Sequence, residues 1–117
     1  MAIVPFQHID TLIEGVILRA GPLTTGDETN ELTVNEGNAE LTVHVHGTVA
    51  GATVAIQGSI VGVVFATVDD VYGDQMSYTV LPQIKSIGPA LNEVKGVVSG
   101  GAGTSVFIDI YKVMKVR

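Results

Sequence analysis

Residues 40–59 read ELTVHVHGTVAGATVAIQGS, with two runs of alternating apolar and polar side chains on either side of a glycine-bearing segment. Successive side chains of a β-strand point to opposite faces of a sheet, so each run predicts a strand with one apolar face. In the first run the two sets are Leu41, Val43 and Val45 against Thr42, His44 and His46. In the second they are Val54 and Ile56 against Thr53, Ala55 and Gln57. Because Gly51 supplies a turn residue without Cβ strain, we predict a β-hairpin that turns at residues 48–52.

The composition of the chain fits a β-rich domain. Its 117 residues are the size of one domain, and 46% of them are hydrophobic although only 5% are aromatic. Many small β-branched residues together with 14 glycines are typical of a sandwich or barrel of short strands. We therefore expect an all-β fold, an antiparallel β-sandwich or a jelly-roll-like barrel, with a single domain over residues 14–117. Pro5 cannot donate a ladder hydrogen bond, so residues 1–13 are expected to form an N-terminal arm or an edge strand.

The charge of the chain excludes several classes of partner. A net charge of −6 gives an acidic surface that repels phosphate, so we expect no nucleic-acid partner. No apolar run reaches the roughly 18–20 residues of a membrane span, so we expect no membrane partner, and no signal peptide is recognisable. The absence of cysteine excludes a disulfide framework and a thiolate zinc site. Because only 15% of the residues are charged, we expect apolar surface to be buried in a homo-oligomer.

Further strands are predicted on both sides of residues 40–59. Before them, GVILRA at 15–20 predicts a strand that Gly21-Pro22 closes, and an acidic loop that follows includes a brief strand at 32–34. After them, alternation or apolar runs predict strands at 62–68, 76–81, 92–99 and 105–116. Between these strands we predict a turn at 69–74, a loop with one helical turn at 83–91 and a hairpin turn at the glycine-rich residues 100–103.

No catalytic motif is recognisable. The acidic residues of 27–40 lack the ligand spacing of an EF-hand loop, and a solvated loop is the better interpretation. Asp69 and Asp70 are adjacent, so on a strand they would point to opposite faces rather than converge. The glycine-rich residues 100–103 are followed by no lysine, so they do not form a phosphate-binding loop. We expect no catalytic residue and no cofactor.

The histidines offer a weak metal signal. His44 and His46 are two residues apart and share one strand face, close enough to bind one ion. His8 is far away in sequence, and no third ligand is indicated. A histidine pair on the polar face of a strand is more often surface or interface, so we expect no metal site.

Two stretches resemble small structural proteins of tailed bacteriophages. VHGTVAGATVAIQGS at 45–59 is similar to the pattern G-T-[FW]-G-G-A-T-V-x-[LI]-Q-x-S of that family, with Val49 and Ala50 in place of the aromatic residue and glycine. EVKGVVSGGAGTSVFIDI at 93–110 is similar to the family's closing hairpin, V-R-x-x-V-S-G-G-x-G-T-S-x-x-V, with Lys95 in place of arginine. The two stretches describe a scaffold and carry over no catalytic residues.

The resemblance implies a structural role in a virion. The favoured version is a capsid decoration, or cement, protein on the capsid surface that binds the major capsid protein and itself, as a homotrimer. The expected interface residues lie in the N-terminal segment and on the last strand: Ile3, Val4, Phe6, Phe107 and Tyr111.

Other functions stay open, among them a head–tail or tail-tube component and a non-viral binding module. The protein could be a tail, fibre or head-fibre component that contacts host glycans, although it has no tryptophan for a sugar platform. It could also be a cupin-like small metalloenzyme, because His44 and His46 match the first two ligands of the motif G-x-H-x-H. The glutamate and the distant third histidine of that motif have no counterpart here.

Overall fold

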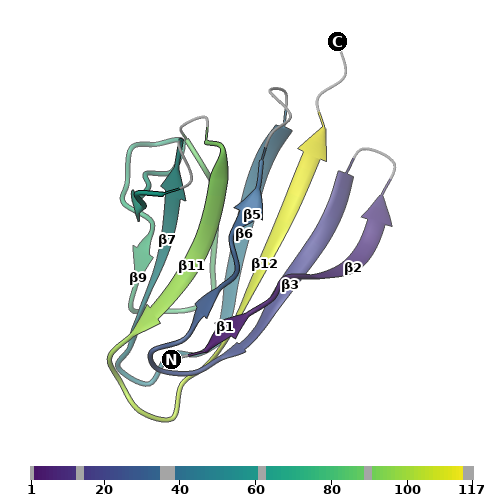
Figure 1. The fold of residues 1–117 in the computed structure, drawn as a ribbon. Helices are drawn as coiled ribbons and strands as arrows, with labels where there is room; N and C mark the ends of the chain where they lie inside the picture. The colour runs from purple at the N-terminus through teal and green to yellow at the C-terminus, as the bar shows by residue number, and fades with distance from the viewer. Residues whose placement is uncertain (1, 13–14, 35–38, 61–62, 89–90, 115–117) are drawn as a thin grey trace.

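The computed structural model describes residues 2–12, 15–34, 39–60, 63–88 and 91–114, and the regular structure within them is entirely β-strand (Figure 1). Within these ranges no helix is long and apolar enough to cross a membrane. The strands are β1 (Ile3–Val4), β2 (Gln7–Leu12), β3 (Gly15–Leu23), β4 (Glu28–Thr29), β5 (Leu32–Thr33), β6 (Ala39–Thr48), β7 (Thr53–Ser59), β8 (Ala66–Thr67), β9 (Ser77–Tyr78), β10 (Gln83–Ser86), β11 (Glu93–Ser99) and β12 (Ser105–Met114).

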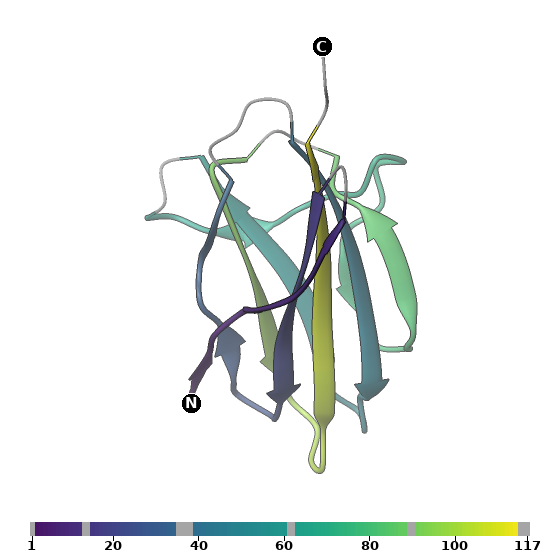
Figure 2. The same ribbon diagram turned by 90° about the vertical axis from the view of Figure 1, so that its right-hand side faces the viewer.

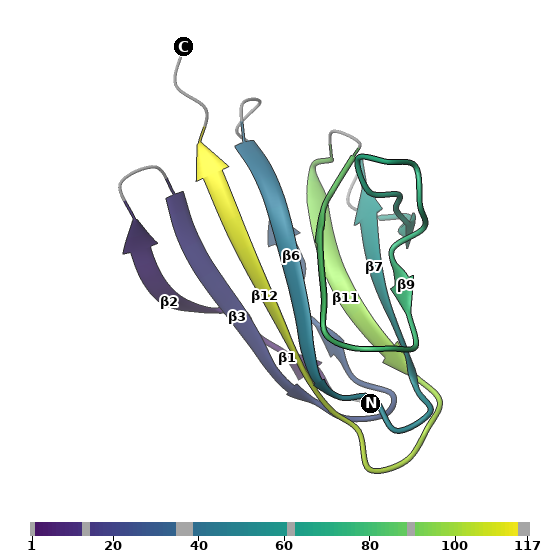
Figure 3. The ribbon, with the colours of Figure 1, turned by 180° about the vertical axis from the view of Figure 1, so that it is seen from behind.

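The strands form two sheets. A five-stranded sheet has the order β10-β6-β12-β3-β2, and its β6, β12, β3 and β2 lie side by side in Figure 3. A seven-stranded sheet has the order β1-β4-β11-β7-β8, with β5 also on β11 and β9 also on β7. All neighbours are antiparallel except β1 and β4. The arrangement confirms the predicted all-β, sandwich-like fold.

The core lies between the sheets and follows the alternation in the sequence. On β6 the apolar set faces inward and His44 and His46 face outward, and on β7 Val54 and Ile56 face inward, as predicted. The buried apolar residues form one cluster: Ala20, Leu23, Val34, Leu41, Val43, Val45, Ala52, Val54, Ile56, Val68, Met76, Tyr78, Val94, Val98, Val106, Ile108 and Ile110. Each large buried side chain stabilises the fold by about 1.5–3 kcal/mol.

The predicted hairpin of residues 40–59 is wrong, because its two strands belong to different sheets. β6 pairs with β10 and β12, whereas β7 pairs with β11, β8 and β9. The second predicted hairpin, at 100–103, is wrong for the same reason, since β11 and β12 also lie in different sheets. Alternation and glycines reveal strands and chain reversals, but they do not specify the partner of each strand edge. Both connections are therefore arches from one sheet to the other.

The two arches, residues 49–52 and 100–104, lie against each other at the lower end of Figure 1. The strands that enter and leave them are neighbours in both sheets, as Thr48 faces Ser105 and Thr53 faces Ser99. A Cβ on Gly101 would lie 2.6 Å from the backbone N of Ala52, so only glycine allows this approach. The two stretches that resemble phage proteins thus meet in one structural unit.

Several shorter predictions need correction. β3 continues through Gly21-Pro22 to Leu23, whose side chain is fully buried, so the strand does not close at residue 20. The strands predicted at 62–68 and 76–81 are reduced to β8 and β9, and residues 61–62 lie outside the described residues. Residues 83–91, predicted as a loop, contain β10, because the open edge of β6 recruits this segment. The brief strand predicted at 32–34 is confirmed as β5.

The N-terminal segment links the two sheets of its own chain. β1 pairs with β4 at one edge of the seven-stranded sheet, and β2 pairs with β3 at one edge of the five-stranded sheet. The Ala2 N–H donates to Asp27 Oδ1 (3.1 Å). Val4 and Phe6 are partly buried against the core. Residues 2–12 therefore provide edge strands.

Candidate functional site

The outer face of the five-stranded sheet carries a cluster of polar and aromatic side chains. On β12 the residues Phe107, Asp109 and Tyr111 alternate with the buried core residues and face outward. The register places Asp109 directly opposite His44 of β6 on one side and Arg19 of β3 on the other. In Figure 2 β12 lies between β3 and β6, so Asp109 stands in the middle of the sheet.

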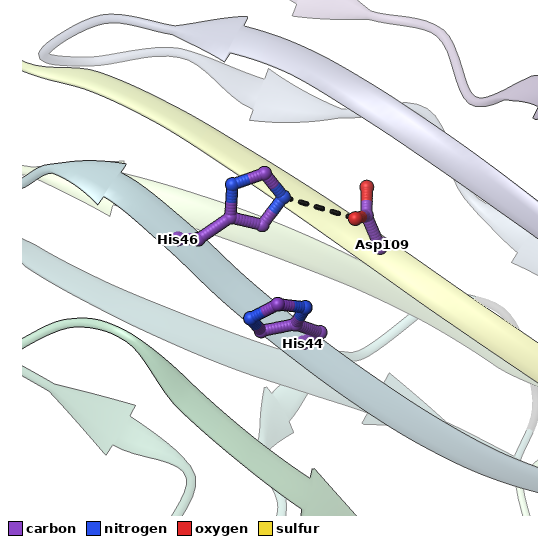
Figure 4. Close-up of side chains that lie close together, drawn as sticks. All are labelled: His44, His46 and Asp109. Carbon is purple, nitrogen blue, oxygen red and sulfur yellow. Dashed lines mark hydrogen bonds and ion pairs between the residues drawn. The ribbon is translucent and has the colours of Figure 1, made fainter.

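Asp109 is the hub of this cluster. The Arg19 guanidinium donates to both of its oxygens, from Nε to Oδ1 at 2.7 Å and from Nη2 to Oδ2 at 3.0 Å. His46 Nε2 forms a third hydrogen bond, 2.9 Å from Oδ2 (Figure 4). The Asp109 side chain is only 14% exposed, whereas the Arg19 side chain is 42% exposed. The fork-like pair fixes the orientation of the carboxylate.

The surroundings keep this carboxylate ionised. Burial disfavours the charged form of Asp109, but the hydrogen bonds and charges of Arg19 and His46 outweigh burial and hold its pKa below the usual range. Conversely, the hydrogen bond and the charge of Asp109 raise the pKa of Arg19. Asp109 therefore presents negatively charged oxygens on an otherwise half-buried sheet face.

Aromatic contacts pack the cluster from one side. The rings of His44 and His46 have centroids 4.7 Å apart, and the His46 ring stacks on Phe107 with centroids 5.4 Å apart and planes 12° from parallel. Arg19 Cζ lies 5.7 Å from the centroid of the Phe107 ring. Gly21 makes room for that ring, because a Cβ there would lie 2.7 Å from it. Phe107 thus orients both the imidazole and the guanidinium.

The cluster contains three possible metal ligands. One ligand atom each from His44, His46 and Asp109 lies within 4.8 Å of the others, and all three side chains are partly accessible. Imidazole nitrogen and carboxylate oxygen are ligands that zinc and similar ions accept. Only the two histidines can be recognised from the sequence, because Asp109 lies far along the chain and joins them through the pairing of β6 with β12. The alternation on β12 places Asp109 outward, but the partner strand could not be read from the sequence.

The other acidic candidates have structural roles. Asp27 is buried and accepts hydrogen bonds from the backbone N–H and the hydroxyl of Thr24, which lower its pKa, and from the Ala2 N–H. Asp70 is buried and accepts from the N–H groups of Tyr72 and Asp74, which confirms the predicted turn. Asp69 is exposed, so the two adjacent carboxylates do not converge.

The expected interface residues fall into two groups. Ile3 is 61% exposed, while Val4 and Phe6 of the same segment pack partly against the core. Phe107 and Tyr111 are half-buried on the outer face of the five-stranded sheet. A partner contact by any of them stays a prediction.

The structure also exposes apolar side chains that the sequence analysis did not single out. They occur at the edges and in the connections, with exposed fractions of 40–84%: Ile9, Leu12, Ile60, Val63, Val64, Val71, Tyr72, Val80 and Ile84. Most of them lie within residues 60–84, where the sequence predicts two longer strands, at 62–68 and 76–81, whose apolar residues would be partly buried. Contiguous exposed apolar surface marks a contact site.

The fold is shared with a prophage-derived protein. The SPBc2 prophage-derived protein YomS aligns with a TM-score of 0.64 and 13% sequence identity, over 89% of this chain and 99% of YomS. KdgF from Halomonas sp. aligns at 0.46 and 12% identity over 94% and 78% of the two chains. The capsular polysaccharide assembling protein CapF from Staphylococcus aureus aligns at 0.44 and 15% identity over 96% and 27%. No family model and no curated protein matches the sequence. The likeness to YomS establishes the fold alone.

Proposed function

We propose that the protein is a virion structural protein of a tailed bacteriophage, and specifically a capsid decoration protein that binds the major capsid protein and stabilises the head shell. The observation that carries the proposal is the edge strand β10 of the five-stranded sheet, at which two apolar side chains are exposed. Ile84 on this strand is 62% exposed, and Val80 before it is 67% exposed. An exposed apolar strand edge is a surface for binding another protein rather than a small substrate.

The backbone of β10 is arranged for strand addition. The Ile87 N–H donates to Leu41 O near the start of β6, whereas Ser86 O points the other way and accepts from Val71 N. Because backbone groups alternate in direction along an antiparallel strand, the N–H and C=O of Ile84 point away from β6, to the side that residues 69–71 cover only at the Ser86 end of the strand. Among the described strands, β6 is the one paired with β10, which stands at the end of the sheet order. An extended segment of a capsid subunit could pair with β10 on the side away from β6.

The other edge of this sheet is less suited to docking. Its strand β2 is exposed along its whole length, but its register with β3 shifts between His8 and Asp10. Such an irregularity bends an edge and discourages pairing with another chain. We therefore assign docking to β10.

The phage assignment rests on fold and sequence together. YomS, described as prophage-derived, shares the fold over nearly the whole of both chains. The two stretches similar to phage structural proteins form the paired arches, so the sequence resemblance falls on a single structural unit. The proposal places the protein on the capsid surface as a homotrimer and assigns it no catalytic role.

The decisive experiment is the copy number of this chain in purified particles of the phage that encodes it, by quantitative mass spectrometry against the major capsid protein. A ratio near one to one, or a fixed simple fraction, supports capsid decoration. A handful of copies would instead assign the protein to the tail or fibres, and none would remove the virion role.

The proposed docking at β10 is then tested by measuring the binding of purified protein to phage heads that lack it. Ile84→Lys should reduce binding at least about tenfold while leaving the fold intact, because a charge would be buried at the pairing edge. Ile9→Lys, on β2, is the matched control and should bind like the unchanged protein. The reverse pattern would move docking to β2.

A further inference from the structure

We propose that His44, His46 and Asp109 form a binding site for a divalent transition-metal ion, with Zn²⁺ as the best-suited ion, on the outer face of the five-stranded sheet. The proposal concerns this face alone and does not depend on the role in a capsid. It goes beyond the sequence analysis, which found two ligands and no third.

The backbone fixes most of the required geometry. His44 and His46 alternate with core residues on β6, so both imidazoles project from the same face. Asp109 is held opposite His44 by the long pairing of β6 with β12. Tetrahedral zinc with ligands at about 2.0–2.1 Å needs ligand atoms roughly 3.3 Å apart. The three ligand atoms lie within 4.8 Å of one another, so side-chain rotation must bring them closer by up to about 1.5 Å.

Neighbouring side chains orient the three ligands, but one of them, Arg19, also lowers the expected affinity for a metal ion. Arg19 Nε holds Asp109 Oδ1 and so fixes the carboxylate, in the manner of outer-shell partners of metal ligands. Phe107 stacks on the His46 ring and limits its rotation. A metal ion would replace the hydrogen bond of His46 Nε2 to Asp109 Oδ2, and the charge of Arg19 would oppose the ion. We therefore expect micromolar affinity rather than the tight binding of a structural zinc site.

The proposed site remains open on its outer side. The side chain of His46 is 28% exposed and that of Asp109 is 14% exposed, so water can reach the ion. Three protein ligands with a fourth position open to solvent form a coordination sphere that zinc commonly adopts.

The test uses the untagged full chain and Zn²⁺ alone, measured by isothermal titration calorimetry, with Co²⁺ absorption as a report of tetrahedral geometry. One Zn²⁺ should bind per chain. Loss of an outer-shell group already lowers metal affinity about 10- to 100-fold, so His44→Ala and His46→Ala should each lower it at least about tenfold. His8→Ala is the control, because His8 lies on β2, where it bonds Thr11 of the same strand, and its loss should leave the affinity unchanged.

Loss of Zn²⁺ affinity in a variant can be distinguished from loss of its fold. His44→Ala leaves the Arg19–Asp109 pair in place, and circular dichroism checks both variants. Nuclear magnetic resonance of the unchanged protein locates the ion independently, through Zn²⁺-induced shifts of the His44 and His46 ring signals. Unchanged affinity in both variants, shifts confined to His8, or no binding at millimolar Zn²⁺ would each overturn the proposal.

Discussion

Asp109 shows how one side chain can organise a sheet face. It sits on the central strand of its sheet, where the side chains of both neighbouring strands reach it. Arg19 approaches from β3 and His46 from β6, and together they offset the cost of partial burial. Arg19 is largely solvated and Asp109 is not. Replacing Arg19 and replacing Asp109 should therefore change the stability of the fold by different amounts.

The coupling between Arg19 and Asp109 can be measured with a double-mutant cycle of Arg19→Met and Asp109→Asn. We expect a coupling free energy of about 1 kcal/mol, the upper end for exposed pairs, because the fork is bidentate but the guanidinium is solvated. Urea denaturation of the four proteins gives this value. Asp109→Asn alone should be the more destabilising change, since the amide keeps one acceptor oxygen of the two that Arg19 and His46 use and loses the negative charge. Additive effects would show that the pair contributes nothing.

Tyr78 should make the stability of the fold decrease at alkaline pH. Burial, with the nearby charges of Asp70 and Asp74, raises the pKa of Tyr78 from 10.0 to about 12. The folded state favours the neutral phenol, so this contribution to stability is complete below pH 10 and is lost as the pH rises toward 12. Absorbance at 295 nm should show one late-titrating tyrosine, absent in Tyr78→Phe. Three tyrosines that titrate together would contradict the prediction.

At the scale of elements, the paired arches hold the two sheets in register. Gly101 has a φ of 71° and touches the backbone of the other arch, whereas Gly103 has a φ of 74° and nothing within 4 Å of its Cβ position. Substituting the two glycines therefore separates the stability cost of a positive φ, which both share, from the cost of a steric contact, which only Gly101 would make.

Alanine at these positions should give two different losses of stability. Gly103→Ala should cost about 1–2 kcal/mol, the penalty of a left-handed conformation for an L-residue. Gly101→Ala should cost at least about 2 kcal/mol more, because its methyl group would also push the arches apart. Chemical denaturation measures both. Equal losses of stability would mean that the arches move apart to accept the methyl group without a further loss of free energy.

The sequence predicts elements better than it predicts their pairing. The alternation on β6, β7, β11 and β12 is regular because each strand has one face on the core, and these strands were found within a few residues. β8, β9 and β10 are too short for a period to be visible, so the sequence predicts longer strands around β8 and β9 and a loop at β10. Asp109 was missed as a member of the cluster because its partners depend on strand pairing, which no local pattern specifies.

At the scale of the whole molecule, the N-terminal segment ties the edges of the two sheets together. It runs from the seven-stranded sheet at β1 to the five-stranded sheet at β2. Phe6 N donates to Asn30 Oδ1 at 2.8 Å, and the segment leaves Val4 and Phe6 packed partly on the core. Its removal therefore tests whether residues 1–6 act within the chain or between chains.

A truncated chain that begins at Gln7 should be less stable by about 2 kcal/mol, because half-buried Val4 and Phe6 lose their packing. Differential scanning calorimetry should show a lower Tm, and analytical ultracentrifugation should show whether assembly changes. If the Tm stays constant while assembly weakens, the segment serves a neighbouring subunit, and the assignment to its own sheets would have to be revised for the assembled particle.

The position of β12 has a consequence for biosynthesis. It is the last of the described strands along the chain, yet it fills the centre of the five-stranded sheet between β6 and β3. A nascent chain on the ribosome therefore carries two bare strand edges until residues 105–114 have emerged. Pairings between such distant segments form slowly. During this interval the unpaired edges of β3 and β6 are exposed, and they are the segments most open to mispairing with neighbouring chains.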